Sequence, residues 1–231
     1  MKILAIDSSA VSCSAAVSED EQILASAFLN NGLTHSQTLM PMVEEVLAKA
    51  NLTVKDIDLF AVTNGPGSFT GVRIGVAAIK GLAFSAHTPC IGISTLEAIA
   101  ANVEQSDCIV VSCMDARRSQ IYTATFRCGS LERLSEDEAV AAISLAERLN
   151  SYDKPVVLCG DGAALTYDIL KDICDNVILM DAEHRYQNAE KVCKLAYRYK
   201  DSAMDSALLV PTYLRPSQAE RELKKRKEQT V

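Results

Sequence analysis

Histidine and aromatic residues are scarce in this sequence, and tryptophan is absent. Among 231 residues there are three histidines, and aromatic residues make up 5% of the chain. His35, His87 and His184 lie far apart, and no His-x-x-x-His pair exists that could hold a metal on one face of a helix. No feature singles out a Ser–His–Asp triad either. We therefore expect the histidines to have surface or packing roles.

Long hydrophobic runs are also missing. No apolar stretch reaches the roughly 20 residues that a membrane-spanning helix needs. The apolar N-terminal run, residues 3–6, is interrupted by Asp7 and is too short for a signal peptide. The sequence therefore predicts a cytoplasmic protein that does not contact a membrane.

Eight cysteines are present, but none forms the Cys-x-x-Cys pair of a zinc ribbon. Most of them lie within apolar runs, for example Cys108 and Cys113 at the two ends of residues 108–113. Cysteines in such surroundings behave as small hydrophobic residues. We expect all eight to be reduced, buried thiols.

The net charge of −7 argues against a protein that covers nucleic acid with one broad basic face. A local basic patch is compatible with this charge, and a partner would then carry much of any contact with RNA. The segment 217–231 is expected to form a charged helical tail that contains the basic run 224–227. Such a run is usually a solvated helix face, and the alternative is a contact with RNA phosphates.

The order of the predicted elements indicates the fold class. Three strands, at residues 3–6, 13–17 and 22–28, precede a helix over 36–50. Strands and helices then alternate, which favours parallel pairing, whereas the first three strands favour an antiparallel meander. The alternating elements are a strand at 59–63, a helix at 70–85, a strand at 90–93 and a helix at 95–102.

The second half repeats this plan, beginning with another apolar strand that ends in Asp, at residues 109–115. Further strands are expected at 120–127, 156–159 and 177–180, with helices from 163 and over 189–199. The sequence thus predicts an α/β protein of two tandem ribonuclease-H-like subdomains, the unit of the actin and sugar-kinase superfamily. Each would have a mixed sheet with flanking helices, over residues 1–103 and 104–216.

Two turns are candidates for binding an anion. Backbone amides and hydroxyls could face a phosphate after the first strand and at the start of the helix over 70–85. The turn after the first strand lacks the glycine that is usual in kinases of the superfamily, and the glycine-rich turn has neither Walker nor dinucleotide-binding spacing. The alternatives are that the hydroxyls cap the first turn and that the glycines bring the helix close to the sheet. The candidate residues are Asp7, Ser8, Ser9, Gly65, Gly67 and Ser68.

Two helices carry more apolar surface than one core face requires. A helix that is apolar almost all round is buried on more than one side, which suggests a subunit interface or a helix sandwiched within its own domain. Methionines suit surfaces that repack around a partner. The candidate interface residues are Met40, Val43, Leu47, Arg73, Val76, Ala77, Lys80 and Phe84.

Several segments in order along the chain resemble the TsaB family, also called YeaZ. The most specific is Gly65-Pro66-Gly67-Ser68-Phe69-Thr70-Gly71-Val72-Arg73-Ile74-Gly75. Similar segments cover residues 3–9, 34–36, 80–83, 93–98, 115–118 with Tyr122, and 211–215. For Asp115 and Arg117 we expect an ion pair within the subdomain.

The resemblance implies a subunit of the machinery that transfers a threonylcarbamoyl group to adenosine beside the tRNA anticodon. It implies a homodimer, or a dimer with the catalytic paralogue TsaD through the first two long helices, and a complex with the ATPase TsaE. ATP and a metal would be used on those partners, and this chain would contact tRNA indirectly or through a minor contact.

The resemblance also implies a chain that is not an enzyme. The paralogue has His-x-x-x-His after its glycine-rich turn, and those positions fall at Thr95 and Ile99 here, which are poor metal ligands. The alternatives are a nucleotide-binding kinase-like enzyme and a metal-dependent glycoprotease-like peptidase.

Overall fold

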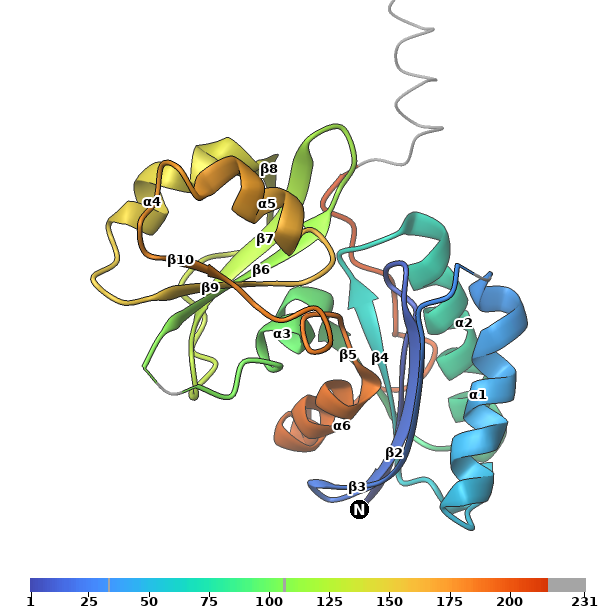
Figure 1. Ribbon diagram of the computed structural model, residues 1–231. Coiled ribbons are helices and arrows are strands. Elements are labelled where there is room, and N and C mark those ends of the chain that lie inside the picture. Colours follow the sequence, from blue (N-terminus) through green and yellow to red (C-terminus); the bar gives the residue numbers. More distant parts are fainter. Residues whose placement is uncertain (33, 106, 216–231) are drawn as a thin grey trace, which may run out of the picture.

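A computed structural model describes residues 1–32, 34–105 and 107–215 (Figure 1). Two five-stranded mixed sheets lie side by side, and helices cover their faces. The strand orders are β3-β2-β1-β4-β5 and β10-β9-β6-β7-β8. The second order, read in reverse, is the first order repeated with later strands, so the predicted duplication of an actin-like fold is confirmed.

The first sheet joins an antiparallel meander to two parallel strands. β1 (Lys2–Asp7), β2 (Cys13–Glu19) and β3 (Gln22–Leu29) pair antiparallel, as predicted. β4 (Leu59–Gly65) and β5 (Cys90–Ser94) continue the sheet in parallel from β1. The apolar run of β1 is fully buried, as expected for a central strand that is covered on both faces.

The second sheet has the same plan. β6 (Ile109–Asp115) pairs antiparallel with β7 (Gln120–Arg127) and parallel with β9 (Val156–Cys159), and β10 (Val177–Leu179) follows β9. The edge strand β8 (Glu138–Ala141) pairs with β7 and was not predicted. All four of its residues are half-buried, so the strand has no alternation of buried and exposed positions that the sequence could reveal.

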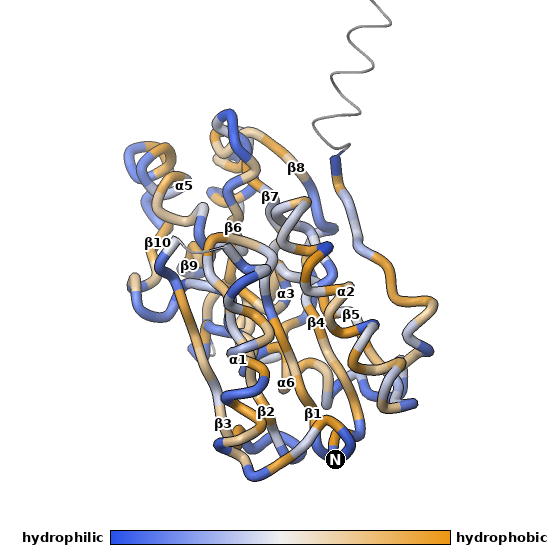
Figure 2. Tube along the Cα trace, turned by 90° about the vertical axis from the view of Figure 1, so that its right-hand side faces the viewer, coloured by the Kyte–Doolittle hydropathy of each residue, from blue (hydrophilic) through white to orange (hydrophobic). Residues whose placement is uncertain are grey.

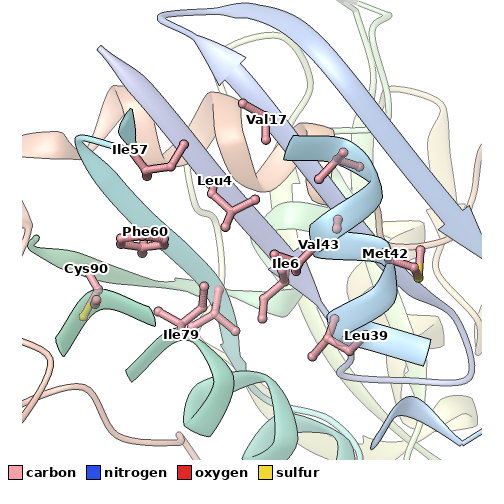
Figure 3. Close-up of a cluster of buried hydrophobic side chains, with 14 of the residues drawn as sticks. Leu4, Ile6, Val17, Leu39, Met42, Val43, Ile57, Phe60, Ile79 and Cys90 are labelled. Atoms are coloured by element: carbon pink, nitrogen blue, oxygen red, sulfur yellow. The ribbon is translucent and has the colours of Figure 1, made fainter. Parts of the chain in front are cut away.

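Two helices pack on one face of the first sheet. α1 (His35–Lys49) and α2 (Phe69–Ala86) contact each other, and the 3-10 turn η1 (Val54–Asp56) lies between them in the chain. Their inner residues meet the sheet in one apolar cluster, where Val43 and Ile79 lie near Ile6 (Figure 3).

By length and composition, α2 is the one helix among the described residues that could cross a membrane. The sequence had not predicted a helix of that kind. The buried side of α2, including Val72, Val76 and Ile79, packs against the first sheet in the same cluster. A core helix of a folded domain meets the same length and composition criteria, and these contacts give α2 that role.

The opposite face of the first sheet is covered by α6 (Ala189–Arg198), which is followed by the 3-10 turn η3 (Lys200–Ser202). Ala189, Val192 and Ala196 pack against apolar residues of β1, β2, β4 and β5. The prediction that residues 104–216 form one second subdomain is therefore wrong at its end. The chain returns to the first sheet at α6, because that face needs an apolar cover.

α3 (Thr95–Ala100) lies between the two halves and packs on the inner face of the second sheet. The outer face of that sheet is covered by η2 (Ala142–Leu145), α4 (Ala146–Asn150) and α5 (Ala163–Leu170). The predicted tail 217–231 lies outside the described residues.

Cys108 and Cys128 form a disulfide with a Cα–Cα distance of 5.4 Å. The prediction of eight reduced thiols is therefore wrong for these two residues. Because Ile109 pairs with Arg127 at the open end of the β6–β7 ladder, the residues just beyond that pair are brought together. The other six cysteines are unbonded and buried, as predicted.

Candidate functional site

A cleft of about 470 Å³ opens between the two subdomains. Its volume lies within the range of small-molecule pockets. Of the six residues predicted to bind an anion, Ser9, Gly67 and Ser68 line this cleft. Asp115 and Asp161 line it from the second subdomain, so the cleft lies where corresponding turns of the two repeats meet.

Asp7 lies beneath the cleft and is fully buried. Its Oδ2 accepts hydrogen bonds from Thr63 Oγ1 (2.5 Å) and Ser9 Oγ (3.0 Å), and its Oδ1 accepts one from the Ser9 amide (3.2 Å). Burial raises the pKa of the Asp7 carboxyl, and the hydrogen bonds oppose this effect. The carboxylate is thus used to fix the turn after β1, which favours the capping interpretation of these hydroxyls.

The glycines at the start of α2 pack against that same turn. A Cβ at Gly67 would lie 2.4 Å from the Ser9 carbonyl oxygen, and one at Gly71 would lie 2.1 Å from the Ser8 carbonyl oxygen. The amide of Ser68 donates to the Ser9 carbonyl (2.6 Å). Because glycine has no side chain, α2 and the turn after β1 can approach each other this closely. The geometry therefore favours the packing interpretation over phosphate approach.

The corresponding turn of the second repeat contains Asp161, which the sequence did not single out. Gly160 has φ +114°, and a Cβ there would lie 2.2 Å from the Cys113 carbonyl oxygen. Asp161 Oδ1 is buried without a hydrogen-bond partner, and desolvation raises the pKa of its carboxyl to about 6. The sequence does offer one signal for Asp161: it follows Gly160 after β9, just as Pro66 follows Gly65 at the end of β4.

Asp115 and Arg117 form the predicted ion pair within the subdomain. Arg117 donates through its backbone amide to Asp115 Oδ1 (2.7 Å) and through Nη1 to Oδ2 (3.5 Å). The Arg117 side chain is largely exposed at the cleft. Such a pair contributes little to stability in water.

The last described segment, residues 203–215, lies along α2 and is called the strap below (Figure 2). Lys80 Nζ donates to the carbonyl oxygens of Ala207 (3.1 Å) and Leu209 (2.9 Å). Leu209 is buried in the cluster beneath α1 and α2. The ammonium group of Lys80, which was predicted to contact a partner, is therefore occupied within the chain.

Arg73 holds the far end of the strap. Its Nε donates to the hydroxyl of Tyr213 (2.7 Å), and its guanidinium lies 3.8 Å from the centre of the Phe69 ring. The rings of Phe69 and Tyr213 stack with centroids 4.5 Å apart. Although Arg73 is exposed, these contacts orient it toward the strap rather than outward.

Three of the predicted interface residues are not on the surface. Val43, Leu47 and Val76 have exposed fractions of 1%, 6% and 4% and lie in the core between the helices and the sheet. For these residues the prediction of a partner contact is wrong, because their apolar side chains already serve the core of the subdomain. Periodicity had shown an excess of apolar surface, but not the direction in which each residue points.

Other apolar residues do lie on the surface of this region. Phe84 is 73% exposed and Met40 is 37% exposed, and Ala77 is exposed between them in the sequence. On the strap beside α2, Leu208 and Val210 are 67% and 61% exposed. The sequence did not point to the strap residues, because nothing local shows that this segment returns to α2.

Thr95 and Ile99, where the resemblance places the metal-binding histidines of the paralogue, are both fully buried in α3. Ile99 belongs to the apolar cluster against the second sheet. Within the described ranges, no group of three or more His, Cys, Asp or Glu side chains is arranged to hold a metal. The residues at these two positions do not fit a metal centre.

Comparisons with known proteins give consistent matches. Residues 30–223 match the family model for TsaD, described as tRNA N6-adenosine threonylcarbamoyltransferase. The chain is 34% identical over 225 residues to the tRNA threonylcarbamoyladenosine biosynthesis protein TsaB of Bacillus subtilis, which covers 95% of this chain and 96% of that protein. It is 32% identical to the Escherichia coli protein of the same name, over 96% of this chain and 98% of the relative.

Solved structures agree on the fold. YeaZ from Pseudomonas aeruginosa superimposes with a TM-score of 0.78 at 24% identity, over 92% of this chain and 99% of that chain. The ethanolamine utilization protein EutJ from Carboxydothermus hydrogenoformans gives a TM-score of 0.52 at 14% identity, over 84% of this chain and 89% of that chain. At these identities the matches speak to the fold alone.

Proposed function

Because this chain belongs to the TsaB family of tRNA threonylcarbamoyladenosine biosynthesis proteins, we propose that it is a non-catalytic subunit of that machinery. It pairs with a TsaD-type catalytic subunit and joins a TsaE-type ATPase, and it acts in the cytoplasm. ATP and the catalytic metal are used on those partners. In the absence of those partners, the surface that would contact the TsaD-type subunit forms a homodimer.

The surface that supports this proposal is the exposed side of α1 and α2 with the adjoining strap, called the α1–α2 face below. Ala77, Gly81 and Phe84 follow one another at helical spacing along the exposed stripe of α2. A Cβ at Gly81 would meet nothing within 4 Å, so the backbone there is open to close approach by another helix. The exposed apolar residues of this face are Met40, Ala77, Phe84, Leu208 and Val210.

An exposed apolar patch of this kind is typical of a protein–protein contact. Phe84 is its most exposed large residue, and buried aromatic anchors dominate the energy of many interfaces. A homodimer through this face would be isologous, with the same patch contributed by both copies. The homodimer and the heterodimer would then exclude each other.

The non-catalytic role is supported by α3. Ile99 cannot ligate a metal, and both it and Thr95 are buried where a substrate has no access. The glycines at the start of α2, Gly67 and Gly71, pack against Ser9 and Ser8, which leaves the glycine-rich turn without the open backbone that a phosphate-binding loop needs.

The experiment is size-exclusion light scattering of the chain mixed with a TsaD-type subunit. Phe84→Glu is expected to weaken the heterodimer at least about thirtyfold, which corresponds to the roughly 2 kcal/mol of a hot-spot residue. Ile143→Glu is the matched control, because Ile143 is 51% exposed on the second subdomain. Circular dichroism checks that both variants fold. Equal heterodimer formation by the two folded variants would defeat the interface assignment.

The cleft favours a second candidate, a nucleotide-binding kinase-like activity. Its volume suits a small ligand, and Asp161 with its raised pKa is the group that could accept a proton there. Calorimetric titration of the isolated chain with ATP tests this candidate. Tight binding would support this candidate, whereas heat changes equal to those of dilution would contradict it.

A further inference from the structure

A groove of about 820 Å³ lies between α6 and the segments that follow α3 and β7, and it shares no lining residue with the interdomain cleft. Four cationic side chains line it, although the protein as a whole has a net charge of −7. They are Lys191, Lys194, Arg198 and Lys200. A local concentration of positive charge on an acidic protein is the electrostatic footprint of an anionic ligand.

Two carboxylates lie at the same groove and offset part of this charge. Glu104 pairs with Lys191 at 3.0 Å, and Glu21 lines the groove. Lys194 is exposed. Four cations against two carboxylates leave the groove with an excess of positive charge.

The remaining cations are positioned by contacts within the chain. Arg198 Nη1 donates to the Ser130 carbonyl oxygen (3.1 Å), on the opposite wall of the groove. Lys200 Nζ lies 4.3 Å from the centre of the Tyr197 ring, a cation–π contact that leaves the ammonium group able to bind an anion. Neither contact neutralises the charge.

The cations form a row on a rigid element. Lys191, Lys194 and Arg198 are three and four residues apart and so share one side of α6. The helix holds this row about 10 Å long, at about 1.5 Å per residue. Its other side is fully buried on the first sheet. Double-stranded DNA carries one phosphate charge per roughly 1.7 Å of its axis, and a row of this length would span several phosphates of a duplex with comparable charge spacing.

We propose that the α6 groove binds the phosphate backbone of RNA. The identification of that RNA as tRNA rests on the proposed function. α6 lies on the opposite face of the first sheet from α1 and α2 (Figure 1), so the groove stays open when a partner occupies the α1–α2 face. The chain would then hold the tRNA body while the partner performs the reaction.

The test uses the full chain and a fluorescein-labelled, unmodified tRNA transcript, with binding measured by fluorescence anisotropy from about 50 to about 200 mM salt. The double variant Lys194→Glu with Lys200→Glu removes two cations of the groove. Lys55→Glu with Lys171→Glu is the matched control, since both lysines are exposed elsewhere and the change in net charge is the same. Lys194→Arg keeps the charge and is expected to bind as the unchanged protein does.

For the groove variant we expect binding weaker by roughly tenfold and a salt slope lower by about two, because two side chains no longer neutralise a phosphate. The control variant is expected to keep both the affinity and the slope. Unchanged RNA binding by the groove variant would overturn the proposal, and so would equally weakened binding by both double variants.

Light scattering with the TsaD-type subunit separates this proposal from the proposed function. If the heterodimer does not form, the proposed function fails, while the anisotropy result still decides whether the groove binds RNA. If the groove variant no longer forms the heterodimer but keeps its RNA affinity, the groove is a protein-binding site, and the RNA proposal is overturned.

Discussion

Gly71 and Gly81 lie in the same helix, α2, and are expected to respond in opposite ways to the same substitution. Alanine favours a helix over glycine by up to about 1 kcal/mol. At Gly81 a Cβ would meet nothing within 4 Å, so Gly81→Ala should raise the free energy of unfolding of the monomer by about 0.5–1 kcal/mol. At Gly71 a Cβ would lie 2.1 Å from the Ser8 carbonyl oxygen, so the helix would have to move away from the turn.

The cost of that movement decides whether Gly71→Ala raises or lowers the free energy of unfolding. Overpacking costs about 1–3 kcal/mol in well-packed cores, and both groups at this contact belong to the backbone, so neither can rotate away. We expect Gly71→Ala to lower the free energy of unfolding by about 2 kcal/mol, and the two variants to differ by about 3 kcal/mol. Unfolding in urea measures both, with an unchanged m-value as the sign that the two-state comparison holds.

A Gly71→Ala variant as stable as Gly81→Ala would refute the packing role of the glycine-rich segment. It would show that the turn after β1 and the start of α2 have room between them. Phosphate approach would then again be the better explanation of the glycines at this position.

Two further predictions concern ionisation and the disulfide. Burial raises the pKa of Asp161 to about 6, so the folded protein keeps a proton that the unfolded chain loses near pH 4, and stability should fall as pH rises between about 4 and 6. Asp161→Asn should abolish this dependence and add up to about 3 kcal/mol at neutral pH, and urea titrations showing the same pH profile for both proteins would contradict this. Reduction of the Cys108–Cys128 disulfide should lower the free energy of unfolding by about 3 kcal/mol, measured with and without dithiothreitol, whereas an unchanged midpoint would show that the pair is not bonded in solution.

Much of the fold could be predicted because one apolar strand marks the start of each repeat. β1 and β6 both end in an aspartate, and each is followed by an alternating strand that pairs antiparallel with it. These signals are local. No local signal predicts that α6 returns to the first sheet, because its apolar face, which includes Val192, would suit either sheet.

The candidate site was predicted less completely for a similar reason. Apolar periodicity identified α1 and α2 as unusual but could not tell that Val76 points to the core and Phe84 to solvent. The role of Lys80 depends on the strap, which lies more than a hundred residues later in the chain. The disulfide likewise follows from strand pairing rather than from the spacing of its cysteines.

The most direct test of the subunit role is reconstituted threonylcarbamoyl transfer to an unmodified tRNA transcript, with the adenylate donor and the TsaD-type and TsaE-type proteins added in all combinations with this chain. We expect modified adenosine when this chain accompanies both partners, and none from this chain alone. Omitting this chain, or replacing it with the Phe84→Glu variant, should sharply reduce the product. Full modification without this chain, or modification by this chain alone, would contradict a non-catalytic subunit that acts through the α1–α2 face.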